Sequence, residues 1–252
     1  MPPRFCIEAS ANAESITVPE RLMAFYYLLL GHLIGDFVLQ TDKIAENKCR
    51  HWKWNLLHVL VVTFCTLGFA YPFGSLLFGM VLLNGAVHFL LDYYKAQITI
   101  KLRLPDLAGF LLDQSIHILL LYLISHFAVY GNQPLIDFII VKYLMVLTFV
   151  TSFSAVFTQF VLAALFQRDG SRFFEKGEKN VGILARIYIV IVFYMSVVQS
   201  TWYLLLLLVV AAAFFLQFKL GWSKWMSPSH LAVKLLFDTV ISAACVFLAV
   251  LL

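Results

Sequence analysis

The sequence predicts an all-α fold, a polytopic bundle of about eight transmembrane helices with both termini on the outer side of the membrane. Three observations lead to this prediction. Of the 252 residues, 62% are apolar and only 13% are charged, whereas about a quarter of the residues in a soluble domain are charged. The apolar stretches run for about 20 residues, the length of a helix that crosses the hydrocarbon core. The positive charges gather in alternate loops.

Eight apolar segments follow a polar leader at 1–21. They cover 22–40, 55–71, 75–94 and 106–130 in a first half (22–130), and 135–166, 181–199, 202–220 and 230–252 in a second half (131–252). A turn at Pro72, Phe73 and Gly74 makes the second and third segments a tight hairpin. The fifth segment is longer than a direct crossing needs, so we expect it to tilt or to project. The stretch 41–54 is expected to be either a short helix on the membrane surface or a polar loop.

The lysines and arginines give the expected orientation. Thirteen of them lie in the four loops on one side of the drawn segments, and two, Arg4 and Arg21, precede the first segment on the other side. Because short basic loops stay in the cytosol, both termini are expected on the periplasmic or extracellular side. This pattern explains the net charge of +4, so we expect the lipid bilayer as a partner and no nucleic acid.

Among the ionisable side chains within the apolar segments of the first half, seven form a pattern. They are three pairs with a spacing of four, namely His32 and Asp36, His88 and Asp92, and Asp113 and His117, together with His58. A spacing of four puts both members of a pair on one helix face. The alternating direction of the segments places all seven in the cytosolic half of the membrane, where they could form one site. Because a charge inside the bilayer costs a few kcal/mol, such groups are functional candidates.

Imidazole and carboxylate together are ligands for zinc, manganese or iron. We therefore predict a divalent metal, zinc or manganese, bound by His32, His58, His88, Asp92 and His117. Asp36 and Asp113 are candidates for the general base or for a second metal ligand, with Asn84 and Gln114 as orienting partners. Arg186, in the sixth segment, is predicted to stabilise charge on a phosphate. In the alternative interpretation, each pair is a hydrogen-bonded unit that locks helix packing.

Three functions are compatible with this pattern. The first is a metal-dependent hydrolase that acts on a phosphorylated or lipid-linked substrate, with hydroxide supplied by the metal. The second is a transporter or channel for protons or a divalent cation. The third is a structural subunit of a membrane complex, with 41–54 and 167–180 as contact surfaces. The sequence has no motif of a serine hydrolase or a nucleotide triphosphatase.

The motifs of the first half resemble the bacterial membrane family catalogued as domain of unknown function 3307. They are GHLIGDFVLQTD at 31–42, AENK at 45–48, LH at 57–58, HFLLDY at 88–93 and DQSIH at 113–117. In the second half, GILAR at 182–186 is similar to the G-x-L-E-R motif of that family, with Ala185 in place of the glutamate. The resemblance implies a bacterial inner membrane location and the same grouping of residues, but no particular reaction.

Overall fold

The structure, a computed structural model, describes residues 19–129, 131–132, 134–166, 176–199, 212 and 228–251. Helices are the only regular elements within these residues, so the predicted all-α class is confirmed. Most of the leader and the segment predicted at 202–220 lie outside the described residues. In the described part of the chain, four stretches are long and apolar enough to cross a membrane, namely Glu20–Val38, Trp52–Lys95, Asp106–Ser125 and Phe138–Phe166.

The first half contains most of the helices that position the candidate site. They are α1 (Glu20–Leu33), which continues into the π-helical turn η1 (Ile34–Val38), then α2 (Asp42–Asn47), α3 (Trp52–Ala70), the 3₁₀ turn η2 (Tyr71–Phe73), α4 (Gly74–Lys101) and α5 (Asp106–Ser125). The predicted hairpin between α3 and α4 is present. At its turn, Gly74 adopts a φ of 82°, a conformation that glycine tolerates better than other residues. Thr41 caps the short helix α2 by accepting a hydrogen bond from the backbone of Ile44. The stretch 41–54 is therefore partly helical.

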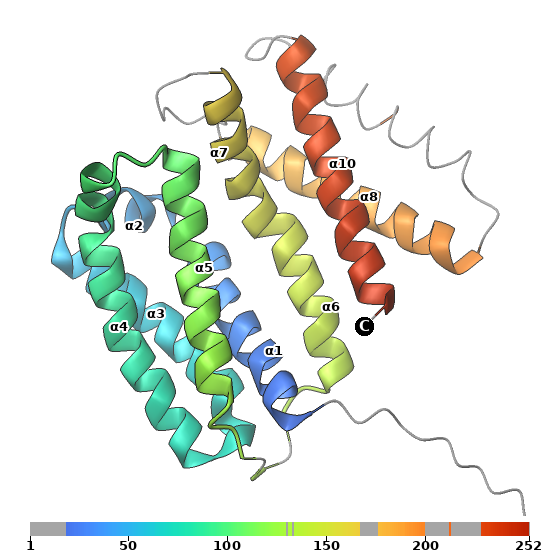
Figure 1. Ribbon diagram of the computed structural model, residues 1–252. Coiled ribbons are helices and arrows are strands. Elements are labelled where there is room, and N and C mark those ends of the chain that lie inside the picture. The colour runs from blue at the N-terminus through green and yellow to red at the C-terminus, as the bar shows by residue number, and fades with distance from the viewer. Residues whose placement is uncertain are drawn as a thin grey trace, which may run out of the picture.

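The second half continues the bundle. It contains α6 (Phe138–Thr148), the π-helical turn η3 (Phe149–Phe153), α7 (Ser154–Phe166), α8 (Lys176–Gln199) and α10 (Pro228–Leu251). The first three of these form one continuous helix of 29 residues, which agrees with the long fifth segment that the sequence predicts. The start of α1 and the end of α10 lie at the same end of the molecule (Figure 1).

Four helices of the first half enclose a common interior. Helix α1 packs on α3, α3 on α4, α4 on α5, and α5 on α1 (Figure 1). The approach of α1 to α3 depends on two glycines, because a Cβ atom at Gly31 would lie 2.7 Å from Cα of Thr66 and one at Gly35 would lie 2.5 Å from Cα of Val62. Small residues with a spacing of four allow helix backbones to touch in this way. We call this arrangement of α1, α3, α4 and α5 the four-helix unit.

One end of the four-helix unit is filled by an apolar core. Its buried members are Ala24, Tyr27, Leu28, Leu30, Leu67, Ala70, Phe73, Leu77, Val81 and Leu121, with Val141 added from α6. The hydroxyl of Tyr27 donates a hydrogen bond to the backbone carbonyl of Ile136, which ties α1 to the segment before α6. These residues come from the start of α1 and α4 and from the end of α3 and α5. The opposite part of the unit is left to the polar residues of the predicted site.

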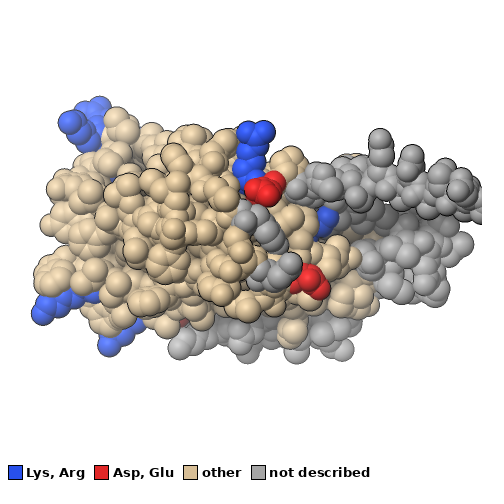
Figure 2. Space-filling view, turned by 90° about the horizontal axis from the view of Figure 1, so that it is seen from below, with Lys and Arg blue, Asp and Glu red and all other residues tan. Residues whose placement is uncertain are grey.

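The outer surface of the four-helix unit is apolar. Phe64 is 71% exposed, Leu83 60%, Leu119 55% and Leu123 51%. Figure 2 views the end where α1 begins, and few charged side chains are seen on it. An apolar surface around a polar interior is the reverse of a soluble protein and is typical of helices in contact with lipid.

Candidate metal centre

The three predicted pairs and His58 meet inside the four-helix unit. His32 lies on α1, Asp36 on η1, His58 near the start of α3, His88 and Asp92 on α4, and Asp113 and His117 on α5. All seven side chains are buried, and Asp113, the most accessible of them, is only 9% exposed. We call these seven residues the His/Asp cluster. The local helical spacing brings each pair to one face, and the packing of the four helices brings the faces together.

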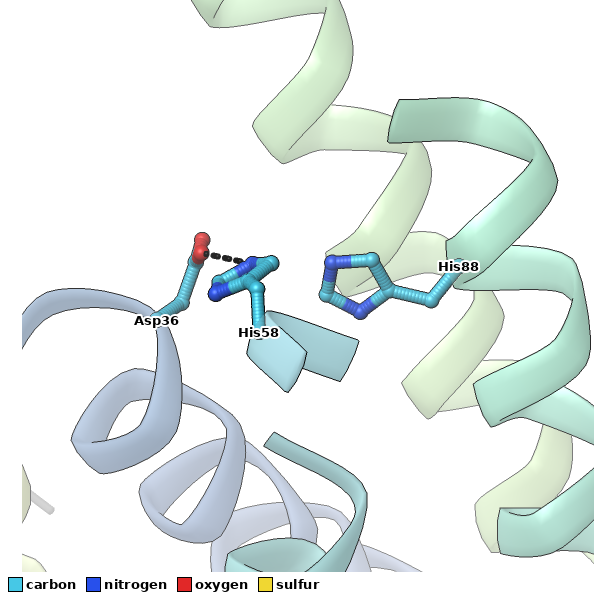
Figure 3. Close-up of side chains that lie close together, drawn as sticks. All are labelled: Asp36, His58 and His88. Carbon is cyan, nitrogen blue, oxygen red and sulfur yellow. Dashed lines mark ion pairs between the residues drawn. The ribbon is translucent and has the colours of Figure 1, made fainter. Parts of the chain in front are cut away.

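His58 lies between two carboxylates that come from different helices. Its Nε2 atom is 3.1 Å from Oδ1 of Asp36 and 3.4 Å from Oδ2 of Asp92. Figure 3 shows the first of these contacts, with the ring of His88 projecting from α4 towards His58. Ligand atoms of Asp36, His58 and His88 all lie within 4.8 Å of one another. Such short separations would allow several of these groups to coordinate a single cation.

Asp92 also faces a second group of imidazoles. Its Oδ2 atom is 3.5 Å from Nε2 of His88, and its Oδ1 atom is 3.8 Å from Nε2 of His117. The ring centroids of His88 and His117 are 4.2 Å apart, and the centroid of His32 is 5.4 Å from each of them. Ligand atoms of His88, Asp92 and His117 again lie within 4.8 Å of one another. The buried His and Asp groups could therefore hold a metal ion.

Several polar atoms of the cluster lack a hydrogen-bond partner among the described residues. They are both ring nitrogens of His32, Nδ1 of His58, Nε2 of His88 and of His117, and both carboxylate oxygens of Asp92, of which Oδ2 has an ion pair with Lys48 at 3.1 Å. A buried polar group without a partner costs about 1 to 3 kcal/mol, so a cluster of them indicates that a further binding partner belongs there. Imidazole lone pairs and a carboxylate are the donor set that a zinc or manganese ion prefers.

The remaining carboxylates have protein partners. Oδ2 of Asp36 accepts a hydrogen bond of 3.1 Å from the amide of Gln114, which agrees with the predicted orienting role of that glutamine. Asp113 lies 3.5 Å from Nε2 of His117 and forms an ion pair of 2.7 Å with Lys95. Asn84 is half-buried, one turn before His88 on α4. Asp36 and Asp113 are thus held at the edge of the cluster, next to the imidazoles.

Lys48 is a member of the site that the sequence did not reveal. Its ammonium nitrogen lies 3.0 Å from Nε2 of His58, 3.1 Å from Oδ2 of Asp92 and 3.6 Å from Oδ1 of Asp36. Burial by itself lowers the pKa of Lys48, but the carboxylates of Asp36 and Asp92 outweigh it and hold this pKa above its ordinary value. The side chain is therefore a cation at neutral pH. In the sequence it is one of several basic residues in a polar stretch, and only its place in the AENK motif at 45–48 distinguishes it from them.

Arg186 lies in a separate buried network. Its guanidinium donates hydrogen bonds to the backbone carbonyls of Val150 and Thr151 in η3, at 2.8 Å and 3.1 Å, and it pairs with Asp238 at 3.1 Å. Asp238 also lies 2.6 Å from the ammonium of Lys234. These contacts use all three nitrogens of the guanidinium, so they favour a packing role for Arg186 over contact with a phosphate.

The comparison with known families supports the grouping of these residues. Residues 24–146 match the family described as protein of unknown function, DUF3307. This stretch contains the whole His/Asp cluster and Lys48, whereas Arg186 lies beyond it. No curated protein and no solved structure shows a significant match. Residues 24–146 therefore carry the DUF3307 domain that the motifs of the first half resemble.

Proposed function

We propose that this chain is a metal-dependent hydrolase of the bacterial cytoplasmic membrane, with a zinc or manganese ion bound inside the four-helix unit. The observation that carries the proposal is the convergence of three buried imidazoles on Asp92, with the ring of His32 beside two of them and with ring nitrogens that lack hydrogen-bond partners among the described residues. The proposed ligands come from His32, His58, His88, Asp92 and His117. A catalytic zinc site typically has three protein ligands, so a subset of these five groups would hold the metal and leave a position open for water or substrate.

Electrostatics supports a cation in the cluster. Asp36, Asp92 and Asp113 bring three carboxylates into the buried interior, and Lys48 and Lys95 contribute two ammonium groups. The positive charges lie beside Asp36, Asp113 and one face of Asp92. On the face of Asp92 that points to His117, no ammonium or guanidinium contact is recorded in the part of the chain that the structure describes. A divalent cation at this face would compensate the carboxylate and pair the free imidazole nitrogens at once.

Hydrolysis needs a nucleophile and a group that accepts its proton. A bound divalent metal lowers the pKa of water towards about 7 and thereby supplies hydroxide near neutral pH. Asp36 is the better placed general base, because its contact with Lys48, at 3.6 Å, is looser than the 2.7 Å ion pair of Asp113 with Lys95, and because it lies near the polar segment 41–54. Asp113 is already paired with Lys95. It is therefore better suited to orienting His117.

The position of the cluster supports a substrate at the membrane surface. The cluster occupies the end of the four-helix unit from which α2 and the basic residues between α1 and α3 emerge. Phosphate groups and lipid headgroups lie at this level of a membrane, and positive charges near the site attract them. A phosphorylated or lipid-linked substrate is therefore the proposed class.

The apolar core favours hydrolysis over transport. Tyr27, Phe73, Leu77 and Leu121 are at most 1% exposed and fill the unit beyond the cluster. An ion that crossed the membrane through this unit would have to pass between these side chains. Proteoliposomes containing the purified chain are accordingly expected to show no proton or divalent-cation flux.

Elemental analysis of the purified protein tests the proposal. We expect a stoichiometric divalent metal in the wild type and its loss in His88→Ala. His51→Ala is the matched control, because His51 is an exposed histidine outside the cluster, and it should keep the metal. If the wild type contained no zinc, manganese or iron, or if His88→Ala kept the same amount, the proposed function would be wrong.

A further inference from the structure

The ammonium of Lys48 stands where a metal ion could stand. It is surrounded by Nε2 of His58, Oδ2 of Asp92 and Oδ1 of Asp36, at 3.0 to 3.6 Å. An ammonium donates hydrogen bonds and has no lone pair, so Nε2 of His58 accepts from Lys48 in the tautomer that carries its proton on Nδ1. Two carboxylate oxygens and an imidazole lone pair that converge on one point are also a ligand set for a divalent cation.

A second point of convergence lies on the other side of Asp92. There Nε2 of His88 and Nε2 of His117 approach the same carboxylate, and the ring of His32 lies next to both. No ammonium or guanidinium is recorded in contact with His32, His88 or His117 among the described residues. Both ring nitrogens of His32, Nε2 of His88 and Nε2 of His117 lack a hydrogen-bond partner among the described residues.

The two points share the carboxylate of Asp92. Its Oδ2 atom faces Lys48, His58 and His88, whereas its Oδ1 atom faces His117. A carboxylate in this position can bridge two cations, as in two-metal sites where the ions are about 3.5 to 4 Å apart. The cluster therefore has the ligand layout of a two-cation site, in which the chain itself provides one of the cations.

We propose that the His/Asp cluster contains two cation positions bridged by Asp92, and that Lys48 permanently fills the one between Asp36 and His58, so that a single divalent metal binds at the other. This inference rests on the proposed metal site and deepens it. Lys48 supplies the second positive charge that a two-metal hydrolase takes from a second ion. A substrate with a phosphate group suits such a pair of cations, because its negative charge is shared by several oxygens.

The position of Lys48 explains how the chain holds it there. Lys48 directly follows α2, a helix of six residues that is capped by Thr41. Ile44, the buried residue of α2, is 7% exposed and lies on the side that packs on α3. The short helix therefore anchors the lysine backbone beside the start of α3, within reach of His58.

Metal stoichiometry tests the inference. Purified protein in detergent is stripped with a chelator, dialysed against Zn²⁺ and analysed for zinc per chain. We expect one zinc in the wild type and two in Lys48→Met, because methionine keeps the apolar stem of the side chain but lacks the ammonium nitrogen, which leaves the three ligands free. Lys43→Met, an exposed lysine on the same helix, is the control and should bind one zinc. Lys48→Arg keeps the positive charge and should also bind one.

The outcomes separate this inference from the proposed function. If the wild type and Lys48→Met bound the same non-zero number of zinc ions, the role of Lys48 would be overturned while the metal site remained. If neither bound zinc, the proposed function itself would fail.

A measurement on the wild type covers the case in which Lys48→Met does not fold. Loading with Mn²⁺ and recording the electron paramagnetic resonance spectrum should show an isolated ion. The spectrum of an exchange-coupled manganese pair in the wild type would contradict the inference.

Discussion

Oδ1 of Asp36 lies 3.1 Å from Nε2 of His58, although the two residues belong to different helices. The contact follows from the packing of α1 on α3, since a Cβ atom at Gly35 would lie 2.5 Å from the backbone of Val62. Gly35 directly precedes Asp36, and Val62 is one turn after His58. The geometry of the site therefore depends on a glycine that carries no chemistry of its own.

We predict that Gly35→Ala destabilises the protein and weakens metal binding together. The added methyl group pushes α1 away from α3, which is expected to cost about 1 to 3 kcal/mol of unfolding free energy and to separate Asp36 from His58. Thermal unfolding in detergent and metal content measure the two effects. Gly79→Ala is the control, because no atom lies within 4 Å of its added Cβ, and it should be neutral or slightly stabilising. Equal behaviour of the two variants would refute the packing argument.

Asp36→Asn should lower metal affinity by about 10-fold to 100-fold, the usual effect of losing a residue that orients a metal ligand. The substitution keeps the shape of the side chain but removes the negative charge that faces His58 and Lys48. Competition with a chelator of known affinity gives the ratio of dissociation constants. Asp137→Asn, at an exposed position before α6, should leave the affinity unchanged. An Asp36→Asn affinity within a factor of two of wild type would argue against a role for Asp36.

Asp238→Asn should destabilise the second half by about 3 to 5 kcal/mol, because it leaves the buried cations Arg186 and Lys234 without their shared carboxylate. Chemical unfolding in detergent measures the loss, with Asp137→Asn again as the exposed control. The protein that remains folded should keep its metal, since this network lies apart from the His/Asp cluster. Loss of metal without loss of stability would instead link Arg186 and Asp238 to the site.

Cys49 offers a test of the predicted orientation. This free cysteine is exposed and lies in the basic stretch between α2 and α3, which the charge pattern assigns to the cytosol. In a Cys6→Ser background, a membrane-impermeant maleimide should label Cys49 in inverted vesicles and not in intact cells. Desolvation raises the pKa of the Cys49 thiol, so the reaction is best run at mildly alkaline pH.

The opposite side of the membrane provides the control for this experiment. Asn132→Cys, at an exposed position between α5 and α6, should show the reverse pattern in a background without Cys6 and Cys49. Labelling of Cys49 in intact cells would show that the assigned topology is wrong.

The structure brings together the His and Asp pairs that the spacing identified. It places Arg186 in a separate network and adds Lys48 to the site. The spacing of four identified the paired faces on α1, α4 and α5, because helical periodicity is a local property of the chain. Arg186 also lies in an apolar segment, and its depth gave no indication that Val150, Thr151 and Asp238 already occupy its guanidinium. Lys48 lies in a polar loop, where sequence carries no information about depth.

The sequence by itself determined the all-α class, the long apolar helices, the hairpin at Gly74 and the composition of the His/Asp cluster. These features follow from composition and from periodicity within single helices, which a one-dimensional pattern contains. The tertiary structure alone decided that Asp92 lies between two groups of imidazoles and that Lys48 reaches three members of the cluster. Those relationships depend on the rotation and separation of neighbouring helices, which are set by contacts such as Gly35 against Val62 between residues far apart in the chain.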